Sequence, residues 1–237
     1  DVCSSDLSGN SEKLAGLLKT NDKGVLQWVR GYSSTSTTVN NYGFDVSSSG
    51  DIFHHIRQGN TYIEHQLLAN DGTTTSWTRS IGADPNDNIH GEIACRIGPS
   101  GGYYITGNDR DNIISKSKFA LFKLDSNGAV SWARALHGAA DQNYITPGRI
   151  FGIDSSENTY HCINRYVHPI APRYTKCSEI VKYNSSGTLQ WKREFRVGMI
   201  SDWDVFDLKG TVCDSSGNSY SFGRYVQANS FSGSRGI

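Results

Sequence analysis

Residues 180–193 read Ile-Val-Lys-Tyr-Asn-Ser-Ser-Gly-Thr-Leu-Gln-Trp-Lys-Arg, and this stretch decides the fold class of the chain. Two short strand-like segments flank a polar turn with a glycine, a pattern that predicts a β-hairpin. We call it the tryptophan hairpin, because each of its four copies carries a tryptophan followed two residues later by an arginine. The copies place these pairs at Trp28 and Arg30, Trp77 and Arg79, Trp132 and Arg134, and Trp191 and Arg193.

A second hairpin recurs between the copies of the first. Its clearest form spans residues 212–220, Val-Cys-Asp-Ser-Ser-Gly-Asn-Ser-Tyr, and we call it the aspartate hairpin. The aspartate side chain is expected to cap the turn, and the glycine is expected to adopt a positive φ. In the copy at residues 153–160, Glu157 stands where the glycine is expected.

Successive tryptophans are 49, 55 and 59 residues apart, so each period holds both hairpins and therefore four strands. Four-stranded units that repeat in this way are typical of β-propeller blades. We predict an all-β fold, a β-propeller built of four-stranded blades, with complete blades near residues 42–80, 92–136 and 149–195. Two half-blades lie at about 14–30 and 210–224. Residues 1–13 are expected to be a disordered or artefactual N-terminus, and residues 14–237 the repeat domain.

The two half-blades leave two arrangements open. They either complete one composite blade in a ring of four, with Leu17–Lys19 paired to Ser219–Phe222, or they are cut ends of a larger ring. We favour a fragment of a larger ring, because residues 1–7 resemble translated sequencing-adapter read-through and small rings are uncommon.

The two hairpins together resemble the bacterial and phage β-propeller repeats called SBBP. The resemblance runs over residues 17–223 and is carried best by Glu179–Arg193 joined to Val212–Gly223. It implies the propeller fold and a place among secreted bacterial proteins or phage structural proteins, such as tail appendages. It implies no particular activity.

The charge balance narrows the classes of partner. Lys+Arg 23 balances Asp+Glu 23, and a nucleic-acid binder normally carries a clustered basic surface, so nucleic acid is not an expected partner. No apolar run reaches the roughly 18 residues of a membrane span, so membrane insertion is not expected. Neither a P-loop, nor Gly-x-Ser-x-Gly, nor His-Glu-x-x-His occurs in the sequence, and no catalytic residue is predicted.

Three groups of residues are candidates for a site. The four Trp and Arg pairs repeat at one strand position, which favours packing between blades over carbohydrate stacking. Aromatic residues are the candidate ligand contacts: Tyr103, Tyr104, Tyr144, Tyr166 and Tyr174. Acidic loops supply candidate calcium ligands, because calcium prefers oxygen: Asp84, Asp87, Asp109 and Asp111. No other cofactor is expected. His54, His55 and His161 are expected to be hydrogen-bonded or solvated strand residues; a metal site would require His54 or His55 to face the central channel together with His161.

These observations predict a non-enzymatic scaffold or interaction module that is extracellular, on a cell surface or on a virion. Its partner would be a protein or carbohydrate surface bound through blade loops, within a larger chain or assembly. The alternative is a carbohydrate-active propeller, a lyase or hydrolase with its site in the central channel. That alternative needs convergent carboxylates. Asp45, Asp154 and Asp214 instead occupy equivalent turn positions, which favours a role in the turns.

Overall fold

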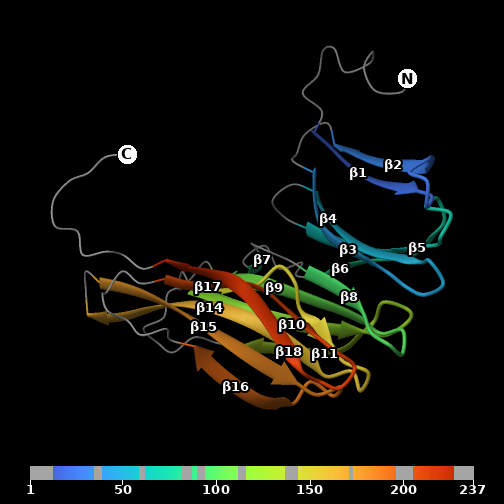
Figure 1. Ribbon diagram of the computed structural model, residues 1–237. Coiled ribbons are helices and arrows are strands. Elements are labelled where there is room, and N and C mark those ends of the chain that lie inside the picture. The colour runs from blue at the N-terminus through green and yellow to red at the C-terminus, as the bar shows by residue number, and fades with distance from the viewer. Residues whose placement is uncertain are drawn as a thin grey trace. The chain divides into compact units, whose positions relative to one another are not determined.

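The computed structural model describes residues 13–34, 39–58, 62–81, 87–89, 94–111, 116–136, 144–170, 173–195 and 205–226. The regular structure in these ranges is β-strand throughout, and the strands form antiparallel hairpins assembled into sheets, as the repeat predicts (Figure 1). Within the same ranges, no helix has the length and apolar character that crossing a membrane requires. The chain divides into two compact units, Asp1–Ala83 and Asp84–Ile237, and each is described by itself.

The first unit contains one two-stranded and one four-stranded sheet, ordered β1-β2 and β3-β4-β5-β6. The four-stranded sheet is built from the two hairpins of the repeat, since β3-β4 is an aspartate-type hairpin and β5-β6 is a tryptophan hairpin. The strands are β1 Lys13–Thr20, β2 Leu26–Ser34, β3 Val39–Val46, β4 Ile52–Gln58, β5 Tyr62–Leu68 and β6 Thr75–Ile81.

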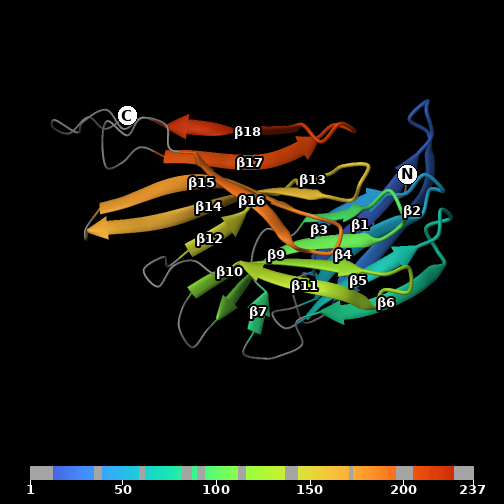
Figure 2. The same cartoon turned by 90° about the horizontal axis from the view of Figure 1, so that it is seen from below.

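The second unit contains two larger sheets. One runs β11-β10-β9-β7, with β8 also paired to β9, and the other runs β12-β14-β15-β17-β18, with β13 on β14 and β16 on β15. Figure 2 shows β17 and β18 beside β15 at the edge of this sheet, where Lys176 and Val205 form the parallel link. The strands are β7 Asp87–Ile89, β8 Ala94–Ile97, β9 Tyr103–Asp111, β10 Lys116–Leu124, β11 Val130–Leu136, β12 Tyr144–Pro147, β13 Gly152–Ile153, β14 Thr159–Ile170, β15 Arg173–Tyr183, β16 Leu189–Phe195, β17 Val205–Cys213 and β18 Ser219–Val226.

The hairpin turns have the chemistry that the sequence predicts. In the turn before β16, Asn184 Oδ1 accepts hydrogen bonds from the amides of Ser186 and Thr188, and the Gly187 amide donates to the Asn184 carbonyl. The turn glycines take positive φ at positions 24, 50, 72, 101, 128, 187 and 217, which glycine adopts without steric cost. Glu157 takes the same conformation, with φ 60°, in place of glycine.

The cores lie between consecutive sheets. In the first unit, Leu17 of β1 packs on Ile52 and Leu68 of the next sheet. In the second unit, Phe119 and Leu121 of β10 pack on residues of the following sheet, including Ile145, Ile163 and Val181. Within each unit, a sheet therefore buries one face on the following sheet of the same unit, which is how repeats that cannot form a core alone become stable.

A four-blade ring would pair a strand of the first unit with a strand of the second, and it remains a prediction. Within the first unit, Leu17 and Lys19 of β1 pair with Arg30 and Trp28 of β2. Within the second unit, β18 pairs with β17, and this hairpin joins the larger sheet through β15 instead of forming a separate half-sheet.

Candidate interaction surface

A tryptophan and an arginine of one sheet hold the glycine turn of the next sheet, and we call this arrangement the clamp. In the first unit, Trp28 Nε1 donates to the carbonyl of Asn70 at 3.3 Å, and Arg30 donates to the carbonyls of Gly72 and Thr73 at 3.0 Å each. The Trp28 ring lies so close over the turn that a Cβ on Gly72 would come within 2.6 Å of it. Only glycine fits under the ring.

The second unit repeats the clamp. Trp132 Nε1 donates to the carbonyl of Ser185 at 3.0 Å, and Arg134 Nε donates to the carbonyl of Gly187 at 2.6 Å. A Cβ on Gly187 would lie 2.8 Å from the Trp132 ring. The same contacts between different sheets show Trp28 and Trp132 acting as packing residues between sheets.

In two of the aspartate hairpins, a tyrosine makes a second contact, with the turn of the next aspartate hairpin along the chain. The Tyr160 hydroxyl lies 2.9 Å from Asp154 Oδ2 in its own turn and 3.1 Å from the Gly217 carbonyl of the following turn. Tyr104 reaches the equivalent position one sheet earlier and donates to Glu157 Oε2 at 3.1 Å. Tyr103 and Tyr104, expected as ligand contacts, lie in strand β9 and are buried, so the structure gives these rings a packing role instead.

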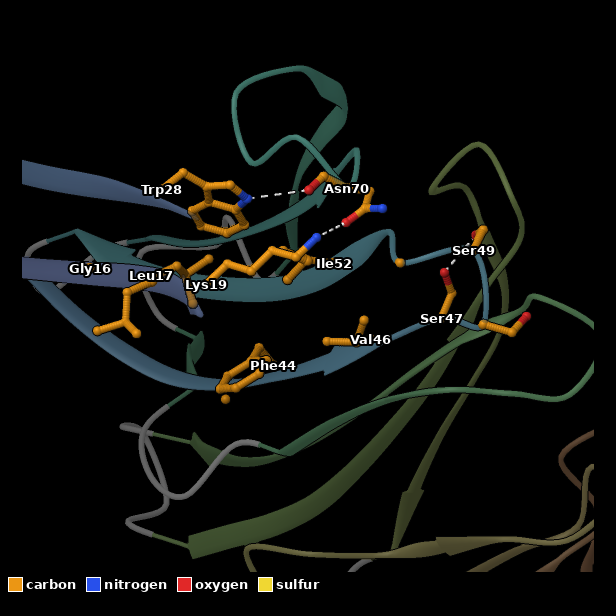
Figure 3. Close-up of a pocket in the computed structure, with 14 residues that line it drawn as sticks. Gly16, Leu17, Lys19, Trp28, Phe44, Val46, Ser47, Ser49, Ile52 and Asn70 are labelled. Atoms are coloured by element: carbon orange, nitrogen blue, oxygen red, sulfur yellow. Dashed lines mark hydrogen bonds between the residues drawn. The ribbon is translucent and has the colours of Figure 1, made fainter. Parts of the chain in front are cut away.

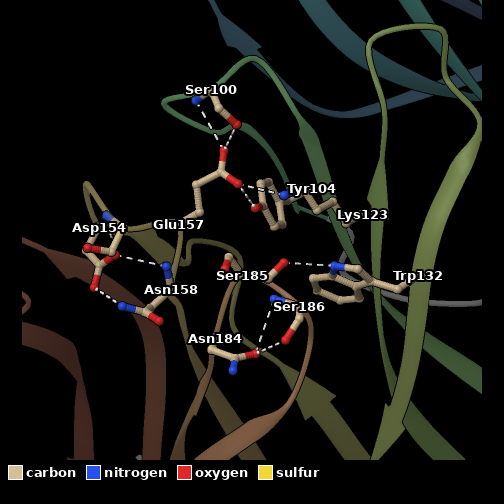
Figure 4. A network of polar contacts seen from close by, with 11 residues as sticks. Ser100, Tyr104, Lys123, Trp132, Asp154, Glu157, Asn158, Asn184, Ser185 and Ser186 are labelled. Carbon is tan, nitrogen blue, oxygen red and sulfur yellow. Dashed lines mark hydrogen bonds and ion pairs between the residues drawn. The ribbon is translucent and has the colours of Figure 1, made fainter.

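Glu157 is the centre of a polar network between two sheets (Figure 4). Its carboxylate accepts hydrogen bonds from the Ser100 amide and hydroxyl, from Tyr104 and from Lys123 Nζ, which lies 2.6 Å away. Burial opposes ionisation, but Lys123 and Ser100 outweigh it and hold the pKa of Glu157 below its ordinary value of 4.5. The sequence shows this residue only as a departure from glycine.

Replacing Glu157 with glutamine is expected to destabilise the second unit by about 1–3 kcal/mol at pH 7, because Lys123 loses its charged partner. Since the folded-state pKa is lowered, the carboxylate stabilises the fold above pH 4.5, and this contribution disappears as the pH falls through the lowered pKa. Denaturant unfolding across this range measures both effects. Glu157→Gly is the control, because it removes the network and relieves the positive φ. A Gly variant more stable than the wild type would contradict a stabilising network.

The first unit contains a groove of about 860 Å³ between its two sheets (Figure 3). One wall is β1 with Leu17, Leu18 and Lys19, and the other is β3 with Phe44 and Val46 followed by the serine-rich turn 47–50. Leu18, Phe44 and Val46 are exposed by 67, 59 and 50 %, so the groove has an apolar lining open to solvent. The half-sheet β1-β2 thus covers only part of the face of the next sheet.

The second unit contains a smaller cavity of about 330 Å³. It lies beside Trp191, Arg193 and Phe195 of β16, and its other walls are Leu208 of β17 and residues of β18. The cavity thus lies between the β15-β16 hairpin and the β17-β18 hairpin of this sheet.

The three other candidate contact tyrosines come together on one sheet. Tyr144 of β12 is directly opposite Tyr166 of β14 in the strand register, and Tyr174 lies on β15, whose Lys176 pairs with Tyr166. Their side chains lie outside the described part of the structure. The backbone nevertheless brings the three strands that carry them to one end of the β12-β14-β15 sheet.

The candidate calcium ligands are only partly described. Asp84 lies outside the described residues, whereas Asp87 and Asp111 are opposite each other in the β7-β9 register, and Asp109 is opposite Ile89. Among the described side chains, no cluster of three His, Cys, Asp or Glu could hold a metal ion. The side chains of Asp87, Asp109 and Asp111 lie outside the described part of the structure, and calcium stays a prediction.

Two of the three carboxylates considered for an enzyme, Asp154 and Asp214, cap turns, whereas the prediction is wrong for Asp45, which lies in β3 two residues before the cap position taken by Ser47. Asp154 Oδ1 accepts from the amides of Ser156 and Asn158 at 2.9 Å each, and Asp214 repeats the pattern with Ser216 and Asn218. Burial raises the pKa of Asp154, but hydrogen bonds from Asn158 and Tyr160 outweigh it and leave the pKa below its ordinary value. A carboxylate held ionised by its own turn is poorly suited to act as a general acid.

A comparison with solved structures finds similarity to a β-propeller domain. No family model matches the chain, and no curated protein matches it. The β-propeller domain of Nup133 from Vanderwaltozyma polyspora is similar over 74 % of this chain, with 9 % sequence identity and a TM-score of 0.38. The match spans about half, 51 %, of that domain.

Proposed function

We propose that this protein is a non-enzymatic scaffold of the β-propeller type, exposed outside the cell, on a cell surface or on a virion, that binds a protein or glycan. The observation that carries the proposal is the repeated clamp. Hydrogen bonds join successive hairpins of the repeat, and they are made by the residues that recur most strictly: Trp, Arg, Gly and Tyr. Such a frame holds variable segments in fixed places, which is the usual arrangement of binding proteins.

The binding surface that we assign to this scaffold is the tyrosine end of the β12-β14-β15 sheet, with Tyr144, Tyr166 and Tyr174. Tyrosine supplies a large ring and a hydroxyl at a low entropic cost, which suits both protein and sugar surfaces. The resemblance to SBBP repeats favours a phage or bacterial surface component as the source of such a scaffold.

A glycan array and binding assays on intact bacterial cells test this proposal. The double variant Tyr166→Ala/Tyr174→Ala is expected to lose binding by at least about tenfold, as for aromatic hot spots. Val130→Ala is the control, because Val130 is 52 % exposed on β11 of the same unit. Unchanged binding by the tyrosine variant would remove this surface, and turnover of a bound glycan would favour the carbohydrate-active alternative.

A further inference from the structure

A buried histidine links the two sheets of the first unit. His54 of β4 is 0 % exposed, and its Nε2 lies 3.0 Å from the hydroxyl of Tyr32 on β2. The centroids of the two rings are 5.4 Å apart. The partners belong to different sheets, β1-β2 and β3-β4-β5-β6, so this hydrogen bond crosses the junction between the sheets.

A fixed positive charge lies at the same junction. The guanidinium carbon of Arg30 lies 5.4 Å from the centroid of the Tyr32 ring, which His54 also contacts. Arg30 donates to the carbonyls of Gly72 and Thr73 at 3.0 Å each. The guanidinium therefore cannot move away from a charge on His54 without giving up the clamp.

The other charged residues on the two facing surfaces are mostly cations. Residues two apart on a strand, and residues directly opposite in the register, share a face of their sheet. Besides Tyr32 and His54, the charged and titratable residues that the register places on these faces are Lys13, Lys19, Arg30, Tyr62 and Glu64. Three cations thus share these faces with one carboxylate. A proton on His54 would add a further positive charge at a buried position.

The closed junction therefore favours the neutral form of His54. Burial lowers the pKa of His54, and the charge of Arg30 lowers it further. Gln66, directly opposite on β5, compensates only in part, so the pKa falls from its ordinary value of 6.5 to about 4. In an open junction His54 meets water and regains its ordinary pKa. The junction is thus fully stable above pH 6.5, and it loses stability as the pH falls towards 4.

The apolar packing at this junction is small enough for one proton to matter. Among the described residues, its buried cluster consists of Leu17, Ile52 and Leu68, with Trp28 and Tyr32 packed against it. The cluster between the two sheets of the second unit contains six buried residues of the described part. The binding of one proton therefore changes the balance between closed and open more readily in the first unit.

We propose that this junction is an acid-operated switch: when His54 takes up a proton, the β1-β2 sheet separates from the β3-β4-β5-β6 sheet while the four-stranded sheet stays folded. The junction is closed at neutral pH, and mild acid opens it and makes the facing apolar surfaces accessible. This inference concerns the first unit alone and does not rest on the tyrosine surface or the ligand proposed above.

Thiol labelling of the full chain with a pyridyl disulfide reagent at pH 7 and pH 5 measures the opening. Leu17→Cys places a thiol inside the junction, since Leu17 is 7 % exposed, and Leu18→Cys places one on the outer face of the same strand, since Leu18 is 67 % exposed. The rate for L18C divided by the rate for L17C cancels the effect of pH on the reagent, and peptide mass spectrometry separates these thiols from the native cysteines. We expect this ratio to fall about twentyfold from pH 7 to pH 5, the factor for one proton bound with a pKa of about 4 when closed and 6.5 when open. A ratio that stays constant overturns the proposal.

Variants of the two neighbouring histidines identify the group that takes up the proton. In His54→Phe the labelling ratio is expected to be independent of pH, and His54→Gln is a second variant that does not titrate and can keep a hydrogen bond to Tyr32. His55→Phe is the matched control, because His55 points to the opposite face of β4, and it should retain the twentyfold change. Circular dichroism checks that each variant folds. A change with pH that persists in a folded His54 variant contradicts the assignment.

A third thiol separates opening of the junction from unfolding of the unit. Leu67→Cys places it on the other face of β5, where Leu67 is 7 % exposed. This thiol should stay protected at pH 5 while that of L17C becomes accessible. Labelling of L67C in step with L17C would mean that the whole unit unfolds, and the switch would be wrong.

Discussion

Trp132→Ala is expected to reduce the free energy of unfolding of the second unit by about 3–5 kcal/mol, the range for removing a large core aromatic. The Trp132 ring packs on two core clusters and covers Gly187, and its indole donates to the Ser185 carbonyl. The substitution removes all these contacts and leaves a cavity between two sheets. Urea denaturation followed by circular dichroism measures the change.

Trp191→Ala is the matched control for this prediction. Its ring contacts one cluster, Cys162, Ile180 and Leu208, and no turn lies on it in the described structure. The loss of stability should therefore be clearly smaller than for Trp132. Equal losses would mean that the clamp adds nothing beyond ordinary packing.

Acid is expected to destabilise the second unit through His161, well above the pH at which carboxylates titrate. His161 is 2 % exposed, stacks on Phe151 at 4.8 Å and approaches Phe119 at 5.3 Å. Its ring nitrogens have no hydrogen-bond partner among the described residues. Burial lowers its pKa to about 3, so the folded state excludes a proton that the unfolded state binds below its ordinary pKa of 6.5.

The stability is thus complete above pH 6.5 and is lost as the pH falls towards 3. At pH 5 this one group costs about 2 kcal/mol. His161→Phe is expected to keep the stability at pH 7 and to remove this part of the acid loss. Thermal unfolding of both proteins between pH 7 and pH 5 provides the measurement, and parallel curves would contradict the assignment. His54 and His55 in the first unit, with pKa values lowered by burial to about 4 and about 3, supply an internal comparison.

The local structure could be predicted from the sequence because it depends on residues close together along the chain. The glycine turns, the two hairpin types and the placement of Asp154 and Asp214 as turn caps all depend on spacings within one hairpin. The single hairpins β1-β2 and β17-β18 followed from counting these repeats. Whether they close a ring depends on contacts between distant parts of the chain, which a local pattern does not contain.

The sites could not be predicted to the same depth. Tyr104 stands beside glycines in the sequence, as a surface aromatic would, and it is buried because a partner 53 residues away supplies Glu157. Glu157 itself departs from the glycine of the turn pattern. Its stabilising contacts are with Lys123 and Ser100 on another sheet. The groove beside Phe44 could not be predicted from the sequence either, because it depends on which part of β3 the β1-β2 hairpin leaves uncovered.

The clamp has a direction, because the tryptophan always belongs to the earlier sheet and the glycine turn to the later one. Each period therefore has a tryptophan–arginine pair and a glycine turn, and the pair of one period fits the turn of the next. A gene that duplicates or deletes one whole period keeps every junction intact, whereas an insertion inside a period must fall between strands to be tolerated. The unequal spacings of 49, 55 and 59 residues between tryptophans are what such a history of whole-period copying and loop growth would leave.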